Sequence, residues 1–436
     1  MAHRSLLWIA FALLSSLAWA QEHAPGTIRA FAGVAAHPEK PGYHQLIYDY
    51  RDGDAQRSMP FLLCLPQGYD QQKQTWPLIV CLSGIGERGQ DPRMLYMWGI
   101  AHDLLEKPDL QAKMPFAILM PQCPTDGTWK TPQVAKAVDR LVQQVTAQWS
   151  IDEMRVYLTG LSLGGGGCWP VARLSPQRYA TIVSISGGAN EPEATAAALK
   201  QSGVTCLIIS GEADLKSVPG SATMAQALRS AELDVIEVVV PAGPHILWPA
   251  YYGDQRFYDW LLSHRRGAAP PGDRMTAGQL AEMGTILGKP DPTRQRLDDE
   301  LQTVAKYWLV DNWGNQVAPG LRKNLVGQNN VYVTPPKSSE IPCRLQTTIK
   351  LPSPRPLLHL EVGHHPQGNW TLLVQVNEKV VREQQVGPQF THDGWMTLDI
   401  DLSAYAAQEV RLQLVVLPSG QVHQEAYWSK VEITGW

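Results

Sequence analysis

Six short, almost uniformly apolar runs between residues 78 and 240 constrain the fold of this chain more than any other feature. They cover residues 78–82, 116–120, 156–159, 182–186, 206–210 and 235–240. Runs of this length and composition are typical of strands buried on both faces of a parallel sheet. Amphipathic segments separate them, and the one over 134–149 has its apolar residues at helical spacing. This alternation predicts a doubly wound, mostly parallel α/β domain.

The N-terminus predicts an export signal. A short positive start, His3 and Arg4, precedes an apolar run over 6–14 that is too short to span a bilayer. Ala18-Trp19-Ala20 then forms an A-x-A cleavage site. We therefore expect a signal peptide over 1–20 and a secreted or periplasmic protein.

The pattern changes after residue 264. Residues 265–271 form a Gly/Ala/Pro linker, and two short helices are expected near 276–287 and 293–307. Strand-like segments separated by turn residues then follow, with no long helix between them. We expect an α/β catalytic domain over 21–264, a linker with short helices over 265–307, and an all-β jelly-roll sandwich over 308–436.

Composition excludes several classes of function. The 436 residues are 44% hydrophobic and 18% charged, and the net charge is −4. This balance predicts a globular protein that binds no nucleic acid and has no basic membrane patch. No later stretch predicts a membrane span. The six cysteines contain no CxxC metal pair. Disulfide connectivity and oligomeric state stay open.

The strongest local motif is a G-x-S-x-G sequence with Ser162 at its centre, flanked by Gly160 and Gly164. It follows a predicted strand and precedes a predicted helix, the context in which this motif forms a nucleophile elbow. The turn lifts the serine hydroxyl to the carboxyl edge of the sheet, and the N–H of Leu163 points to where an oxyanion would form. Ser162 is therefore the predicted nucleophile.

A nucleophilic serine needs a base and an acid that orients the base. His245 follows the last predicted strand, whereas His264 ends a predicted helix. We expect His245 to be the base, because the carboxyl ends of parallel strands gather in one place. Asp214 follows the strand over 206–210 and is the predicted acid, with Glu212 in the same loop as its rival.

A glycine-rich loop follows the first buried run. It has the sequence Ser83-Gly84-Ile85-Gly86-Glu87-Arg88-Gly89. The loop lacks the lysine and spacing of a Walker motif. Gly84 and Gly86 allow close approach of the backbone to a substrate, so we expect the Ile85 N–H to be the second oxyanion donor.

These motifs, with Pro121-Gln122-Cys123-Pro124, resemble secreted α/β-hydrolase esterases related to polyhydroxybutyrate depolymerases and to feruloyl and acetyl-xylan esterases, a group also labelled prolyl-oligopeptidase-like predicted peptidases. The resemblance covers about residues 60–262. It implies a triad of Ser162, Asp214 and His245. Ser83 departs from the histidine usual at that position, and Pro244 from the glycine that often precedes the catalytic histidine.

The C-terminal segment resembles galactose-binding-like domains attached to glycan-processing enzymes. The resemblance lies in Gly394-Trp395, 401–405 and Ala426-Tyr427-Trp428. Trp370, Trp395 and Trp428 fit a sandwich core better than a ligand platform, and whether this domain binds sugar stays open.

We therefore expect a serine hydrolase that cleaves carboxylic esters, on small molecules or on plant or algal polysaccharides, through an acyl-enzyme. A serine-hydrolase mechanism implies no metal and no organic cofactor. A serine peptidase with the same triad is the first alternative, although the chain lacks an N-terminal propeller that would restrict access to peptides. A non-catalytic glycan-binding protein with a relic triad is the second.

Overall fold

The computed structural model describes residues 26–31, 37–70, 74–269, 271–285, 292–420 and 422–435. The predicted signal peptide, residues 1–20, lies outside the described residues. The chain forms two compact units that divide at residue 288, and two short segments, Gly86–Gly89 and Tyr96–Trp98, group with the second unit.

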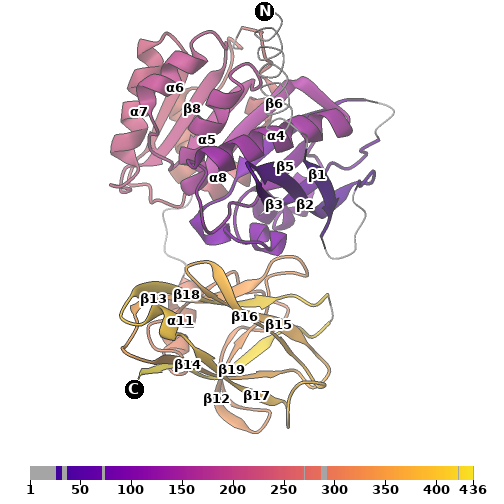
Figure 1. Ribbon diagram of the computed structural model, residues 1–436, viewed down its shortest axis with the longest axis vertical. Coiled ribbons are helices and arrows are strands. Elements are labelled where there is room, and N and C mark those ends of the chain that lie inside the picture. Colours follow the sequence, from indigo (N-terminus) through magenta and orange to yellow (C-terminus); the bar gives the residue numbers. More distant parts are fainter. Residues whose placement is uncertain are drawn as a thin grey trace, which may run out of the picture. The chain divides into compact units, whose positions relative to one another are not determined.

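A nine-stranded sheet forms the centre of the first unit, in the order β1-β2-β3-β5-β4-β6-β7-β8-β9. Figure 1 labels β1, β2, β3, β5, β6 and β8 of this sheet. The strands from β5 to β9 in this order are parallel, and β1, β2 and β3 pair in antiparallel fashion at one edge. This is the mixed, mostly parallel sheet of an α/β hydrolase, as predicted. The strands are β1 (Thr27–Ala30), β2 (Gly42–Asp52), β3 (Ala55–Leu65), β4 (Trp76–Leu82), β5 (Ala117–Pro121), β6 (Ile151–Leu161), β7 (Thr181–Ile185), β8 (Thr205–Gly211) and β9 (Asp234–Val240).

Helices pack against both faces of this sheet. Alternate strand residues such as Val80 and Leu158 share a core with the helices α4 to α7. On the other face, the Thr159 hydroxyl lies 2.9 Å from the Tyr252 hydroxyl, and the Tyr157 hydroxyl donates to the His264 carbonyl at 2.9 Å. The unit is therefore doubly wound. Its helices are α2 (Ile100–Leu105), α3 (Pro108–Gln111), α4 (Pro132–Gln148), α5 (Leu163–Leu174), α6 (Pro192–Leu199), α7 (Val218–Ser230), α8 (Trp248–Tyr252), α9 (Gln255–Leu262) and α10 (Ala277–Gly284).

The second unit is a sandwich of two five-stranded antiparallel sheets, in the orders β10-β13-β18-β15-β16 and β11-β12-β19-β14-β17. Leu345, Leu372 and Leu414 from the first sheet share one core with Leu360 and Trp428 from the second. The strands are β10 (Leu309–Asp311), β11 (Gly320–Leu325), β12 (Gln328–Thr334), β13 (Cys343–Lys350), β14 (Pro356–His364), β15 (Trp370–Val376), β16 (Lys379–Val386), β17 (Trp395–Asp401), β18 (Glu409–Leu417) and β19 (Ala426–Gly435).

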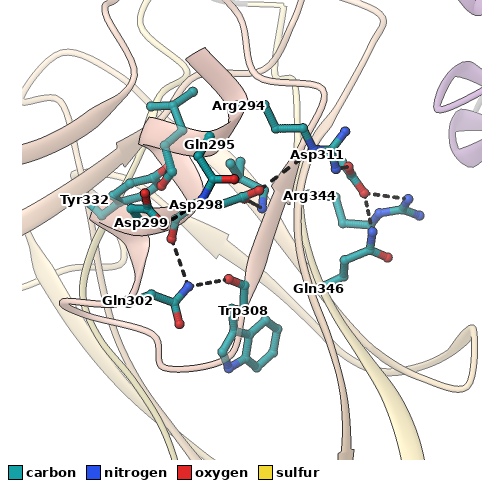
Figure 2. A network of polar contacts seen from close by, with 12 residues as sticks. Arg294, Gln295, Asp298, Asp299, Gln302, Trp308, Asp311, Tyr332, Arg344 and Gln346 are labelled. Atoms are coloured by element: carbon teal, nitrogen blue, oxygen red, sulfur yellow. Dashed lines mark hydrogen bonds and ion pairs between the residues drawn. The ribbon is translucent and has the colours of Figure 1, made fainter. Parts of the chain in front are cut away.

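One helix, α11 (Pro292–Leu301), is bound to this sandwich by both apolar and polar contacts. Leu297 and Leu301 are fully buried in the sandwich core. Figure 2 shows Asp311 of β10 accepting hydrogen bonds from Arg294 of α11 at 2.6 Å and from Arg344 of β13 at 3.2 Å. A buried carboxylate with two cationic partners ties the helix to the sheet.

The expected linker over 265–307 therefore contains structure that belongs to the two units. The helix α10 contacts β9 of the first unit, whereas α11 contributes to the core of the second. Among the described residues, no helix is both long and apolar enough to cross a membrane. All six cysteines are buried and none is in a disulfide.

Candidate active site

Ser162 occupies a strained turn between β6 and α5. Its backbone has φ 52° and ψ −114°, a region that residues other than glycine rarely adopt. The Ser162 N–H donates to the Ile185 carbonyl at the end of β7 at 2.9 Å, which anchors the turn to the neighbouring strand. This is the strand–elbow–helix geometry that the G-x-S-x-G motif predicts.

The glycines around Ser162 are required by close backbone contacts. A Cβ on Gly160 would lie 2.4 Å from the Gly164 carbonyl oxygen, and one on Gly164 would lie 2.0 Å from the Leu82 carbonyl oxygen. The next glycines in α5 face similar limits, since a Cβ on Gly165 would lie 2.6 Å from the Ile185 oxygen. The helix therefore packs directly on the sheet, which accounts for glycines that otherwise destabilise a helix.

His245 lies between Ser162 and Asp214 in space. Its Nε2 atom is 2.9 Å from the Ser162 Oγ, and its Nδ1 atom is 2.6 Å from the Asp214 Oδ2. Since a carboxylate only accepts hydrogen bonds, the Nδ1 carries the proton and the Nε2 presents its lone pair to the serine hydroxyl. His245 can therefore accept the Ser162 proton while the Asp214 carboxylate holds the ring and stabilises its positive charge.

The alternative acid and base residues make other contacts and do not join this chain of hydrogen bonds. The Glu212 carboxylate accepts the Ala242 N–H at 2.8 Å and so supports the loop after β9. The His264 Nδ1 donates to the Trp260 carbonyl at 2.8 Å, and burial lowers the pKa of this ring. Asp234 binds Arg274 and begins β9, at the opposite end of that strand from the loop that carries His245.

Two serines that the sequence did not single out hold the loops of the site together. The Ser186 hydroxyl donates to the His245 carbonyl at 2.8 Å, and the Ser217 hydroxyl donates to the Ser186 carbonyl at 3.0 Å. Burial alone would raise the pKa of Asp214, but hydrogen bonds from Ser217 and His245 outweigh it, so the pKa lies below 3.8. Asp214 therefore stays ionised at neutral pH and can stabilise a positive charge on His245.

The predicted oxyanion donors lie at the starts of two helical turns. Leu163 is the first residue of α5, so its N–H belongs to the unpaired amides of a helix N-terminus. Ile85 begins a 3-10 turn, Ile85–Glu87, flanked by Gly84. The Trp129 indole N–H donates to the Ser83 carbonyl at 2.8 Å, which positions the start of this loop.

No family model matches the sequence, and no curated protein matches it. Solved structures do show similarity. A thermostable esterase is 25% identical over 51% of this chain and 63% of its own, with a TM-score of 0.45. A CE1 ferulic acid esterase from Anaeromyces mucronatus is 17% identical over 54% of this chain and 93% of its own, with a TM-score of 0.38. An acylaminoacyl peptidase from Pyrococcus horikoshii is 12% identical over 54% of this chain and 44% of its own, with a TM-score of 0.40.

The matched regions cover about half of this chain, and this chain spans less than two thirds of the thermostable esterase. All three TM-scores are below 0.5, so the function proposed below rests on the geometry of the site itself.

Proposed function

We propose that this protein is a serine hydrolase that cleaves carboxylic esters. The observation that carries the proposal is the chain of hydrogen bonds from Ser162 through His245 to Asp214, at 2.9 Å and 2.6 Å. A serine hydroxyl gains nucleophilicity when a correctly oriented imidazole can accept its proton. A strained elbow that exposes this hydroxyl beside a helix N-terminus supports the same function.

The reaction follows from these positions. The Ser162 oxygen attacks the acyl carbon while His245 accepts the hydroxyl proton, and the N–H groups of Leu163 and Ile85 hold the oxyanion. His245 returns the proton to the departing alcohol, which leaves an acyl-serine. Water then attacks this ester and passes a proton to His245, which gives it to the Ser162 oxygen as the acid is released.

Exposed apolar residues follow two triad residues in the sequence, and they support an apolar or aromatic ester substrate. Leu215 follows Asp214 and is 81% exposed, and Ile246 follows His245 and is 42% exposed. Large exposed apolar groups beside catalytic residues can shield the bound ester from water. The sequence resemblance to feruloyl and acetyl-xylan esterases extends the proposal to esters carried by plant or algal polysaccharides.

A substrate panel tests this proposal. Purified protein would be assayed on methyl ferulate, acetylated xylan, a methyl glucuronoyl ester, short-chain p-nitrophenyl esters and peptide amides. We expect ester hydrolysis with a kcat/KM well above that for the amides, and no activity in Ser162→Ala. Ser175→Ala, beyond the other end of α5, is the matched control. Faster cleavage of the amides would make the protein a peptidase, and inactivity on every substrate would favour a relic site.

We also propose that the protein is exported, on the strength of residues 1–20. Expression of the full chain in a bacterial host should yield a mature protein whose intact mass corresponds to a start at Gln21. A mass that retains residues 1–20 would contradict the proposal.

A further inference from the structure

Two loops meet at one end of the sandwich, where β14 ends and β19 begins. These strands are antiparallel, and His364 at the end of β14 lies opposite Ala426 at the start of β19. The next residue outward on each strand is His365 on one side and Glu425 on the other. His423 lies two residues before Glu425, so strand pairing gathers three potential metal ligands from distant parts of the sequence.

The three side chains face one another closely. One ligand atom from each of His365, His423 and Glu425 lies within 4.8 Å of the others. The rings of the two histidines stack with their centroids 3.6 Å apart, and the His423 Nδ1 is 3.6 Å from the Glu425 Oε1. A tetrahedral Zn²⁺ holds its ligand atoms about 3.3 Å apart, so binding requires the two stacked rings to tilt until their in-plane lone pairs converge on the ion.

The polar groups in this cluster are only partly satisfied by protein partners: the Tyr427 side chain hydrogen-bonds the Glu425 carboxylate, whereas one histidine nitrogen has no such partner in the described part of the chain. The Glu425 side chain is only 4% exposed, and the His423 Nδ1 is buried without a hydrogen-bond partner among the described residues. Burying a carboxylate and a ring nitrogen in this way is unfavourable unless a cation or a donor satisfies them.

The neighbouring Arg322 and His364 are bound to other groups. Arg322, whose charge acts on the neighbouring Tyr427, donates hydrogen bonds to the carbonyls of Gly320 and Leu321. His364 is also committed, because its Nδ1 binds the His365 carbonyl at 2.6 Å and its Nε2 binds the Thr391 hydroxyl at 2.7 Å. The buried carboxylate therefore faces the two histidine rings and the Tyr427 hydroxyl, with no arginine or lysine bound to it among the described residues.

The backbone holds both histidine loops in place. The Asn369 N–H donates to the His423 carbonyl at 3.2 Å, and a Cβ on Gly368 would lie 2.2 Å from that oxygen. The Gln367 N–H donates to the His365 Nδ1 at 3.2 Å, so this nitrogen presents a lone pair. That bond is exposed, and water can replace the ring as its acceptor when an ion binds the nitrogen.

We propose that His365, His423 and Glu425 form a binding site for a divalent transition-metal ion, with Zn²⁺ as the best fit. Two imidazole nitrogens and one carboxylate are ligands that Zn²⁺ prefers, whereas Ca²⁺ and Mg²⁺ take oxygen ligands. Three protein ligands leave a fourth position for water. The ion clamps the loop before β19 to the end of β14. This site lies in the second unit and is independent of the proposed hydrolase chemistry.

Metal titration of the full chain tests the proposal directly. After treatment with EDTA and desalting, Zn²⁺ would be titrated by calorimetry and in competition with a chromogenic chelator, with Ca²⁺ in parallel. We expect one Zn²⁺ site in the micromolar range or tighter that is absent from His423→Ala, a rise in melting temperature with Zn²⁺, and no effect of Ca²⁺. Glu425→Gln preserves the shape of the buried side chain and should weaken binding about 100-fold or more.

His359→Ala is the matched control. It also removes an imidazole from β14 whose Nδ1 faces a carboxylate, Asp399, at 2.5 Å, but it lies outside the cluster. This variant should bind Zn²⁺ as the wild type does. Equal affinity in His423→Ala and the wild type, no Zn²⁺ binding by the wild type, or equal loss in His359→Ala would each overturn the proposal.

Discussion

The Nε2 atom of His245 lies 2.9 Å from the Oγ atom of Ser162, although 83 residues separate them in the sequence. Each residue follows a parallel strand, β9 for the histidine and β6 for the serine. The sheet brings the carboxyl ends of these strands to one edge, which places the base near the nucleophile.

Asp214 and Glu212 lie in the same loop but should differ in their effect on catalysis. Asp214→Asn should lower kcat for ester hydrolysis on the order of 10⁴-fold, because an amide favours the wrong tautomer of His245. Glu212→Gln should stay close to the wild type, since a glutamine oxygen can still accept the Ala242 N–H. Steady-state kinetics of both variants would check this, and a larger loss in Glu212→Gln would reverse the assignment of the acid.

Gly164 should tolerate no side chain. Gly164→Ala places a Cβ about 2.0 Å from the Leu82 carbonyl oxygen and should lower the free energy of unfolding by at least about 3 kcal/mol. Gly278→Ala is the control, because this exposed position in α10 has only the Thr276 Oγ1 nearby, at 3.9 Å. It should stabilise the protein by about 0.5–1 kcal/mol. Urea denaturation of both variants measures the difference, and similar stabilities would contradict the packing described for α5.

Asp234 and Arg274 should make the stability of the first unit depend on acid pH. The Arg274 guanidinium holds the pKa of Asp234 below 3.8 and outweighs burial, which acts to raise it. A lowered pKa in the folded state adds stability that is present above the unfolded-state pKa and is lost as the pH falls through the folded-state pKa. Asp234→Asn should therefore lower the free energy of unfolding by about 1 kcal/mol at neutral pH. The variant should also lack the part of the wild-type loss of stability at acid pH that comes from protonation of Asp234.

The measurement for this prediction is the unfolding free energy between pH 2 and pH 7. The control is Asp273→Asn, which changes an exposed carboxylate in the same segment as Arg274. If Asp234→Asn and the wild type show parallel pH dependence, the ion pair does not contribute as described.

The helix α11 should be needed for the sandwich to fold. A fragment of residues 292–436 should melt cooperatively. A fragment of residues 308–436 lacks the core residues Leu297 and Leu301 and the hydrogen bond from Arg294 to Asp311. Burial of two leucines contributes about 3–6 kcal/mol, so the shorter fragment should be marginal or unfolded. Calorimetry of the two fragments would compare their melting temperatures and the cooperativity of their unfolding. Equal melting temperatures would show that α11 is dispensable.

The sequence was informative where strands are buried on both faces and weak where they are half exposed. The central parallel strands could be predicted because their residues are uniformly apolar. The strands β11 and β16 have no such pattern, since exposed polar residues such as Lys323 and Glu383 interrupt it. Trp370 and Trp428 are buried in the sandwich core, in line with the expected core role.

The residues of the candidate site also differ in how well the sequence predicts them. Ser162, Asp214 and His245 could be named because motif and strand position single them out. Ser186 and Ser217 could not, because a serine after a strand or before a helix has no distinctive signal in the sequence. His365 and Glu425 are separated by 60 positions in the chain, and only the register of β14 with β19 brings them together.

The most direct test of the proposed hydrolase is covalent labelling of the nucleophile. Purified protein would be incubated with a fluorophosphonate, digested, and mapped by mass spectrometry. We expect one adduct per chain, on Ser162, that is absent from Ser162→Ala and greatly slowed in His245→Ala, because the hydroxyl reacts only when the imidazole accepts its proton. An unlabelled wild-type protein, or equal labelling of wild type and Ser162→Ala, would contradict the account.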